Sequence, residues 1–438
     1  MDKNIISLAK KFQEHKKNLY IVGGFCREEI LGISWKNTTD IDFTTDALPD
    51  EVQNIVRCIW HIWKKYGTQI IQENNQSFEI TTFRSDIWNL DNRKPVEVVF
   101  TLDLQLDSQR RDFTCNAVYY DILAEKYIDP QNGIWDIKDK KLKFIWNPNK
   151  RIQEDALRIL RAIRFKNQYS FEFAEENYYE ILEQNIHLLK NISPERIKVE
   201  LDKIFLNSNN TQAWKDLKKI WFLQLFFPEM EKQSQTPGNS HHLEWDVWTH
   251  TLMTIEYFNT MKISVSRQEK LDYYWCLLFH DVTKPMCYWE DEKWEWHYYG
   301  HEKSGAEYFK TNICSILPFS KKSQHKISWV IENHLRVFKV FEMKKLKSRK
   351  LMMHKYWPDL MIIAQADHMG RIPANFWLIE KLENFYTDFL EILKNKKFYT
   401  GKDILEKFPD VEKNKIWEKL EQLNNQILIS DDINKKTK

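Results

Sequence analysis

The sequence predicts an α+β protein in which a small mixed sheet with helices is followed by all-helical regions. The first observation is a set of short, β-branched apolar runs, all before about residue 145, at 19–22, 41–45, 78–83, 96–100 and 118–122. The second is the helical spacing of apolar residues that follows Pro148, at Ile152, Ala156, Ile159, Leu160 and Ile163. The third is a polar stretch at 233–240, centred on Pro237 and Gly238, which reads as a linker or long loop between two helical regions.

The composition fits a soluble globular protein of two or three domains. The chain has 438 residues, of which 42% are hydrophobic and 29% are charged. No apolar run is as long as a membrane span and the N-terminus lacks a secretory pattern, so we expect a cytoplasmic protein without a membrane partner. The six cysteines include no CxxC pair, which favours reduced thiols. A net charge of +2 neither requires nor excludes a nucleic-acid partner.

Gly23, Gly24, Asp40 and Asp42 are the most informative residues of the first region. Asp40 and Asp42 are two apart in a β-prone run, so a strand would project both carboxylates from one face. Two such carboxylates repel each other unless a cation lies between them, and Mg²⁺ prefers oxygen ligands. The two glycines follow an apolar strand and would let backbone N–H groups approach a phosphate. Together they predict nucleotide chemistry, whereas the alternative is a surface turn with two unrelated aspartates.

Two further segments extend this prediction. Glu79 lies in an alternating strand pattern and could be a third carboxylate at the metal, or an ordinary strand acid. Arg110 and Arg111 offer forked donors to phosphate or ribose oxygens, and the adjacent Asp112 could accept a hydrogen bond from a sugar hydroxyl. The Arg-Arg-Asp pattern alone is weak, because many surface turns share it.

A predicted helix over 151–161 carries Asp155 and Arg158. Their spacing of three would place both side chains on one face of that helix, opposite the apolar stripe. An acceptor and a donor side by side could match the hydrogen-bonding edge of a base. The alternative is an ordinary ion pair that contributes a few tenths of a kcal/mol.

These motifs, in this order, closely resemble the class II CCA-adding enzymes and bacterial poly(A) polymerases. The resemblance is carried by segments 20–27, 40–47, 110–117 and 154–165, and it extends over roughly the first half of the chain. It implies a polymerase-β-like nucleotidyltransferase head at 1–145 and a helical neck and body at 146–232 that select the base and bind RNA. A segment at 193–201 also resembles the one that follows the neck in this family.

The resemblance also implies roles for individual residues. Asp40 and Asp42 would hold Mg²⁺, with Glu79 as a further catalytic carboxylate. Gly23, Gly24 and Arg27 would seat the triphosphate, and Arg111 with Asp112 would address the ribose. Asp155 and Arg158 would pair with CTP or ATP, and Arg161 belongs to the same nucleotide-binding segment. The reaction would be a two-metal, in-line displacement in which the 3′-hydroxyl of a tRNA attacks the nucleoside triphosphate and pyrophosphate departs.

The second helical region carries histidines and aspartates on successive predicted helices. Such residues are how an all-helical fold builds a metal site, although a lone buried histidine is usually only a core residue. The pattern resembles the HD phosphohydrolase domain, which we expect at 241–370, before a helical tail at 371–438. By that resemblance the ligands of a divalent metal are His250, His280, Asp281 and Asp367, with His301 and His334 as candidates for a second ion. Thr283 stands where the motif usually has glycine. The domain could hydrolyse phosphate esters or be retained for structure.

The leading functional hypothesis is therefore addition of CCA, from CTP and ATP, to tRNA 3′ ends. Alternatives within the class are poly(A) polymerase and an enzyme that adds only CC or only A. Residues between Arg84 and Pro95 are expected to influence that choice. Two alternatives belong to other functional classes. One is an HD phosphohydrolase with an inactive head, and the intact Asp40 and Asp42 pair argues against it. The other is a non-catalytic tRNA-binding protein.

The balance of glycine and tryptophan is unusual. The chain has only 10 glycines in 438 residues, where about 7% is usual, and it has 18 tryptophans. Trp146, Trp221 and Trp245 fall where the family usually has glycine. We hypothesise that the source organism reads UGA as glycine and that the sequence was translated with UGA as tryptophan. The alternative is ordinary substitution in an aromatic-rich chain.

Overall fold

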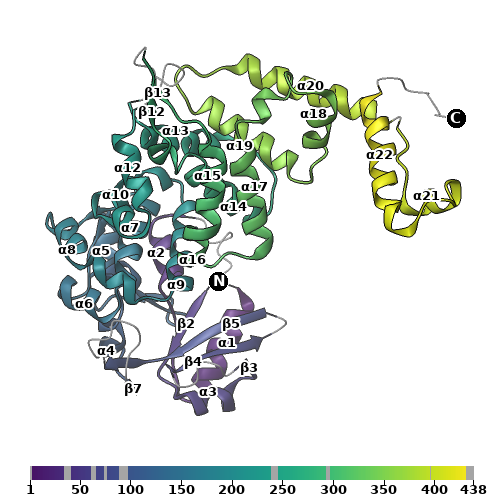
Figure 1. Cartoon of the computed structure of the whole chain (residues 1–438). Coiled ribbons are helices and arrows are strands. Elements are labelled where there is room, and N and C mark those ends of the chain that lie inside the picture. Colours follow the sequence, from purple (N-terminus) through teal and green to yellow (C-terminus); the bar gives the residue numbers. More distant parts are fainter. Residues whose placement is uncertain are drawn as a thin grey trace. The chain divides into compact units, whose positions relative to one another are not determined.

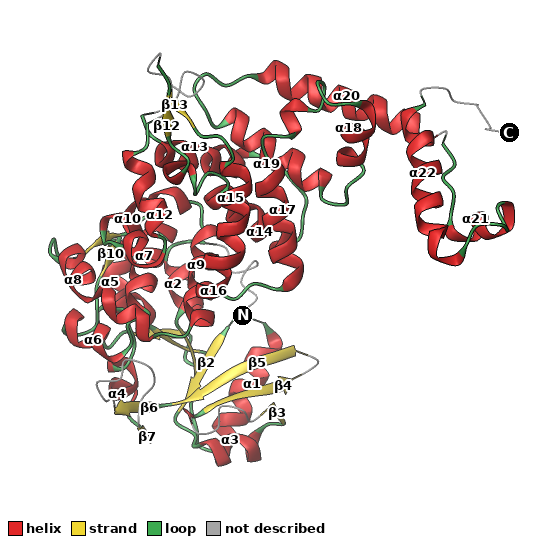
Figure 2. Cartoon of the chain, viewed as in Figure 1, coloured by secondary structure: helices red, strands yellow, loops and turns green. Residues whose placement is uncertain are grey.

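The computed structural model describes residues 2–33, 41–60, 66–73, 76–87, 97–237, 245–292, 296–394 and 396–430. The chain forms two compact units, 1–226 and 227–438, which are treated separately below (Figure 1). The first unit combines a sheet with helices and the second is almost entirely helical, which confirms the predicted α+β class (Figure 2). The finer division into four domains stays a prediction.

A seven-stranded sheet organises the first unit among the described residues. Its order is β3-β4-β5-β2-β1-β8-β9. The strands span Leu19–Val22 (β1), Asp42–Thr45 (β2), Cys58–Trp60 (β3), Thr68–Glu73 (β4), Gln76–Thr82 (β5), Tyr119–Asp121 (β8) and Lys126–Ile128 (β9). Only β2 and β5 are parallel neighbours, and the other pairs are antiparallel. A separate hairpin joins Arg84–Ile87 (β6) to Glu97–Phe100 (β7). All five predicted strand segments are confirmed.

Helices pack on this sheet in the head, and the rest of the first unit is almost entirely helical. The head carries α1 (Lys3–Glu14), α2 (Gly24–Ile30), α3 (Pro49–Ile55), α4 (Leu104–Gln109) and α5 (Gly133–Lys138). The neck and body follow with α6 (Pro148–Glu154), α7 (Arg158–Gln168), α8 (Tyr178–Asn185), α9 (Pro194–Phe205), α10 (Asn210–Lys219) and α11 (Phe222–Phe226), and the two-residue strands β10 (Lys141–Leu142) and β11 (Glu172–Phe173) pair with each other. Apolar side chains such as Ile21, Phe43 and Ile80 alternate inward from the central strands and are almost fully buried.

The prediction of one helix over 151–161 is wrong. Helix α6 ends at Glu154, Asp155 adopts an extended backbone with φ −145° and ψ 101°, and α7 begins at Arg158. The Asp155 carboxylate accepts a hydrogen bond from the backbone N–H of Leu157 at 3.2 Å. An aspartate that bonds to nearby backbone in this way competes with the helix. Asp155 and Arg158 therefore do not share the face of a single helix.

Two of the three anomalous tryptophans have a left-handed backbone. Trp146 has a φ of 73° and Trp221 a φ of 66°. Trp221 directly follows Ile220, the C-cap of α10, at the position where helices most often end in glycine. Side chains other than glycine, and bulky ones above all, rarely adopt this conformation. Trp245, in the second unit, is not among the described residues with a positive φ, so only Trp146 and Trp221 have the conformation that the glycine hypothesis predicts.

The second unit is helical apart from one two-stranded hairpin among its described residues. Its helices are α12 (Pro228–Lys232), α13 (Val247–Thr260), α14 (Arg267–Phe279), α15 (His301–Tyr308), α16 (Cys314–Ile316), α17 (Lys321–Asn333), α18 (Lys345–Met352), α19 (Trp357–Met369), α20 (Phe376–Lys394), α21 (Gly401–Lys407) and α22 (Ile416–Ile429). The hairpin pairs β12 (Trp289–Glu290) with β13 (Trp296–His297). Helix α14 is buried on nearly every face, because nine consecutive residues from Leu271 to Phe279 are buried. It is thus the central element on which a site in this unit can be built. No helix among the described residues is both long and apolar enough to cross a membrane.

Candidate functional site

Asp42 and Gly23 lie side by side at the ends of neighbouring strands. Strands β1 and β2 are antiparallel with Val22 opposite Asp42, so Gly23 leaves β1 next to this carboxylate. Gly23 has a φ of 79° and is the N-cap of α2, and a Cβ on it would lie 3.6 Å from an Asp42 carboxylate oxygen. The space is adequate, so it is the backbone conformation that requires glycine here. Asp40 lies outside the described residues, and its pairing with Asp42 stays a prediction.

Glu79 lies beside Asp42 across the parallel pair of strands. The register of β2 and β5 places Asp42 directly opposite Glu79. Residues in register on neighbouring strands project from the same face, and both side chains are exposed. The structure therefore brings Glu79 to the neighbourhood that the sequence predicted. Its role as a metal ligand stays a prediction.

A cavity of about 530 Å³ lies in the first unit and is lined by residues from head and neck. All predicted nucleotide-site residues within the described range line it, except Glu79: Gly23, Gly24, Arg27, Asp42, Arg111, Asp112, Asp155, Arg158 and Arg161. Arg110, which the sequence offered with Arg111 as a donor to phosphate or ribose oxygens, also lines it. Sequence reasoning missed Glu28, Arg84, Asp86, Asn116, Arg164, Phe165, Gln168 and Tyr169. Arg164 could have been found, since it follows Arg158 and Arg161 at a spacing of three. Arg84 carries no local signal.

The lining of the cavity is rich in arginine. Seven arginines and five carboxylates line it, and the arginines present forked donors that match phosphate oxygens. Arg84 is largely buried, and burial together with Arg110 lowers its pKa to about 10, so it remains charged at neutral pH. Most of these arginines already pair with a carboxylate, as Arg161 does with Asp112, but a guanidinium has five N–H donors and could also bind a phosphate oxygen.

Asp112 and Arg111 are held firmly at the cavity wall. Arg161 donates to Asp112 at 2.6 and 2.7 Å, and the Asn116 amide donates to the other carboxylate oxygen at 2.8 Å. Burial alone would raise the pKa of Asp112, but Arg161 and Asn116 outweigh burial and hold it well below its ordinary value. Arg111 donates to Asp107 at 3.2 Å and to the Tyr119 hydroxyl at 3.1 Å. Both groups are thus preorganised and ionised.

Asp155 and Arg158 both line the cavity, although they do not share a helix. Arg196 donates to Asp155 at 2.8 Å, and Arg158 donates to Glu154 at 2.7 Å. Arg151 lies beneath them and donates to the backbone carbonyls of Arg110 and Arg111, the second at 2.6 Å. The break after α6 thus lets one short segment contact head, neck and cavity together.

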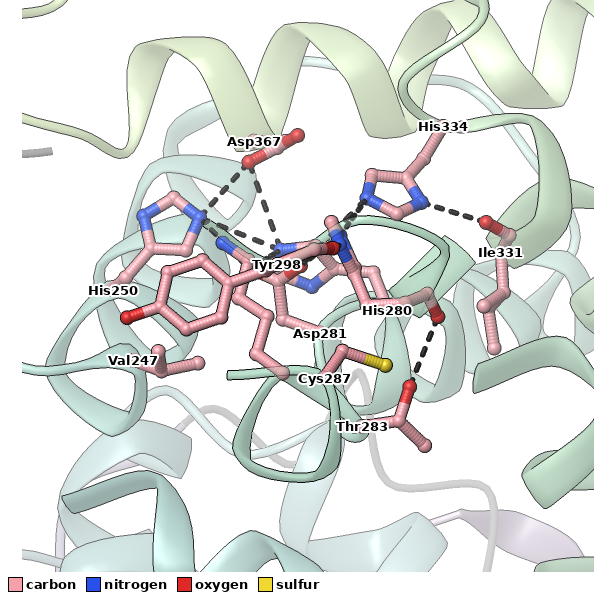
Figure 3. Close-up of polar contacts among 12 residues, drawn as sticks. Val247, His250, His280, Asp281, Thr283, Cys287, Tyr298, Ile331, His334 and Asp367 are labelled. Carbon is pink, nitrogen blue, oxygen red and sulfur yellow. Dashed lines mark hydrogen bonds and ion pairs between the residues drawn. The ribbon is translucent and has the colours of Figure 1, made fainter. Parts of the chain in front are cut away.

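The second unit gathers six residues into one buried cluster (Figure 3). His250 comes from α13, His280 and Asp281 follow the end of α14, His301 begins α15, His334 ends α17 and Asp367 lies on α19. Asp281 is central: one carboxylate oxygen lies 3.1 Å from His280 Nε2, and the other lies 3.1 Å from His301 Nε2. Asp367 lies 2.9 Å from His250 Nε2. The structure thus brings together all six predicted ligands.

The ring nitrogens of this cluster are arranged for a cation. His280, His301 and His334 each donate Nδ1–H to a backbone carbonyl three residues earlier, at 2.8, 2.6 and 2.6 Å. In a neutral imidazole this leaves a lone pair on Nε2. The Nε2 atoms of His301 and His334 nevertheless lie 3.3 Å apart, beside the Asp281 carboxylate. Burial, and then His301, lower the pKa of His334 to about 3, so this ring is neutral.

This arrangement fits divalent metal. Lone pairs that converge with carboxylates repel one another, and a cation between them removes the repulsion. Two groups have ligand atoms within reach of a single ion: His250, His280 and Asp281, and Asp281, His301 and His334. Lys284 forms an ion pair with Asp281 at 2.7 Å at the edge of the cluster. Thr283, at the unusual motif position, donates to the His301 carbonyl at 3.0 Å and supports the start of α15.

The comparisons with known proteins agree with this geometry. Residues 19–143 match the family described as the Poly A polymerase head domain. Residues 171–234 match the family described as the probable RNA and SrmB-binding site of polymerase A. The chain is 42% identical over 199 residues to a CCA-adding enzyme of Bacillus pumilus, covering 45% of this chain and 48% of that protein. It is 34% identical over 273 residues to a CCA-adding enzyme of Staphylococcus haemolyticus, covering 61% and 66%.

Solved structures resemble the whole chain in fold. The Bacillus stearothermophilus CCA-adding enzyme in complex with CTP has a TM-score of 0.65 at 20% identity, covering 98% of this chain and 93% of that one. The Thermotoga maritima CCA-adding enzyme complexed with tRNA has a TM-score of 0.59 at 17% identity, covering 98% and 95%. Against the curated relatives named above, the matched part of the chain spans only about half to just under two thirds of their length. The matches agree in order and place with the motifs of the first unit, and the chain belongs to the family of nucleotidyltransferases with a poly(A) polymerase head domain, which includes the CCA-adding enzymes.

Proposed function

We propose that the protein is a template-independent RNA nucleotidyltransferase that adds CCA, from CTP and ATP, to tRNA 3′ ends in the cytoplasm. The observation that carries the proposal is the arginine-rich cavity beside Asp42, which the head and neck form together. The sequence relatives are named CCA-adding enzymes, and solved structural relatives contain CTP, ATP or tRNA.

Different residues would bind the phosphates, the sugar and the base of the nucleotide. Arg27 and the backbone at Gly23 and Gly24 would receive the triphosphate, since α2 starts there. Asp42, with Asp40, would hold Mg²⁺, which when bound neutralises the phosphates and lowers the pKa of the attacking RNA 3′-hydroxyl. Arg111 and Asp112 would orient the ribose.

Base selection falls to Asp155 and Arg158. Asp155 pairs with Arg196 and Arg158 pairs with Glu154, so both side chains are oriented while each keeps further capacity to bond to a base edge. A wrong base would leave such a buried group unpaired, which costs about 1–3 kcal/mol. This cost is the basis on which CTP and ATP would be preferred without a template strand.

The reaction itself tests the proposal. Purified protein with Mg²⁺ is given tRNA transcripts ending before CCA, after C and after CC, with labelled CTP and ATP separately and together. Addition that stops after CCA supports the proposal. Long A tails would identify a poly(A) polymerase, addition of A only to a CC end a partial enzyme, and absence of incorporation would refute nucleotide transfer.

The second unit favours a second candidate activity, hydrolysis of phosphate esters by a divalent-metal HD centre. The two groups of ligand atoms within reach of an ion, five buried residues in all, support it, and Asp367 lies beside His250. Lys284, which contacts Asp281, would offer a positive charge to a phosphate oxygen. An HD phosphohydrolase with an inactive head is the alternative of another class, and Asp42 in the cavity argues against it.

Metal content provides a direct check on the second unit. We expect at least two divalent ions per chain in protein purified with Mn²⁺ or Co²⁺, measured by mass spectrometry of the metal, because the head could bind such an ion as well. His301→Ala should lose at least one ion, because it removes a ligand beside Asp281. His297→Ala is the matched control, since His297 contacts Asp291 at 3.0 Å outside the cluster. Equal metal content in the two variants would contradict the assignment.

A further inference from the structure

Arg27 is held from several sides in the cavity of the first unit. It is only 4% exposed, although arginine is usually a surface residue. Its Nη1 donates to the Asn116 side chain and its Nη2 donates to the Tyr169 hydroxyl at 2.6 Å. The guanidinium carbon also lies 4.4 Å from the ring centre of Tyr169 and 4.8 Å from that of Phe165, within range of cation–π attraction. Tyr169 thus contacts Arg27 in two ways, through its ring and through its hydroxyl.

The Tyr169 hydroxyl is the centre of a small network. It accepts from Arg27 at 2.6 Å and from the Gln168 amide at 3.0 Å, and it donates to Glu28 at 2.8 Å. Arg27 and Glu28 belong to α2 of the head, whereas Tyr169 is the C-cap of α7 in the neck. Burial raises the pKa of Tyr169 above its ordinary value, so the hydroxyl stays protonated and can donate at neutral pH. One neck side chain therefore fixes two consecutive head side chains.

The orientation of Arg27 matters because its guanidinium can still donate a hydrogen bond to a ligand. Its buried Nε–H has no hydrogen-bond partner among the described residues. A buried donor without an acceptor is unfavourable, and a phosphate oxygen entering the cavity would be drawn to this guanidinium. The side chain of arginine has many rotamers. Because the ring and the hydroxyl of Tyr169 already hold Arg27 in one of them, less conformational entropy is lost when a ligand binds.

We propose that Tyr169 is the positioning residue that fixes Arg27 for the triphosphate of the incoming nucleotide. The inference rests on the proposed function, since it assigns the phosphates to Arg27. Tyr169 acts through Arg27 and not on the base, so it sets affinity for CTP and ATP alike.

The test separates the hydroxyl from the ring. Tyr169→Phe removes only the hydroxyl, and Tyr169→Leu removes the ring as well. We expect KM for both CTP and ATP to rise about tenfold in the first variant and further in the second, with kcat within about threefold of wild type. The ratio of CTP to ATP use should not change. Binding of tripolyphosphate with Mg²⁺, measured by calorimetry, should weaken by the same factor as KM rises.

Two controls keep the result specific. Tyr179→Phe removes a hydroxyl that donates to Asp216 at 2.9 Å in the same unit, outside the residues that line the cavity, and should leave KM unchanged. In an Arg27→Ala background, Tyr169→Phe should cause no further loss of tripolyphosphate affinity. Unchanged affinity in Tyr169→Phe, or a full additional loss in the Arg27→Ala background, would overturn the inference. If the wild-type protein incorporates no nucleotide, the proposed function fails, and the calorimetric comparison still decides the role of Tyr169.

Discussion

Asp42→Asn is expected to reduce nucleotide addition by more than about a thousandfold while the fold is retained. The substitution keeps the shape of the side chain and removes the negative charge beside Gly23, at the mouth of the arginine-rich cavity. Asp42 is exposed at the start of β2, so the substitution does not disturb the packing of the core. Single-turnover addition of one nucleotide to a tRNA transcript measures the effect.

The control lies just beyond β2, and a second informative variant lies on the neighbouring strand β5. Asp46→Asn changes an aspartate just beyond β2 that accepts from Asn18 at 2.8 and 2.6 Å, and it should leave addition nearly unchanged. Glu79→Gln distinguishes a metal ligand from an ordinary strand acid, since only a ligand would shift the dependence on Mg²⁺ concentration. Full activity in Asp42→Asn would refute the assignment of this carboxylate. Metal content of the second unit should be the same in all three variants.

Trp221→Gly and Trp146→Gly are each expected to stabilise the protein by about 1–2 kcal/mol. Both residues have a left-handed backbone that glycine adopts without steric cost. Neither indole is deeply buried, with exposed fractions of 51% and 74%, so little packing is lost. Lys150 lies 5.5 Å from the ring centre of Trp146, and this exposed contact offsets only a small part of the gain. Urea unfolding monitored by circular dichroism measures the change.

Two other tryptophans serve as controls for this prediction. Trp245→Gly, at 90% exposure and without a positive φ, and Trp417→Gly, in helix α22 at 77% exposure, should each destabilise the protein by about 0.5–1 kcal/mol. Stabilisation in all four variants would show that removal of exposed indoles, and not backbone conformation, is responsible. The codons decide the cause, because UGG at positions 146, 221 and 245 would end the hypothesis that UGA is read as glycine.

The sequence by itself determined the features that depend on local pattern. Alternation and β-branching located the strands that hold Asp42 and Glu79, and the apolar run before His280 placed the His-Asp pair at a helix end. The resemblance then assigned nine of the residues that line the cavity. These patterns can be recognised in the sequence because each depends on residues only a few positions apart.

The tertiary structure decided what depends on distant contacts. At the break, the Asp155 side chain accepts hydrogen bonds from the backbone N–H of Leu157 and from Arg196 of another helix, contacts that a periodic apolar stripe does not reveal. Arg84 and Tyr169 reach the cavity only because sheet register and helix packing bring segments more than 50 residues apart together. A cavity wall has no repeat along the chain, so its members cannot be identified before the fold that assembles them.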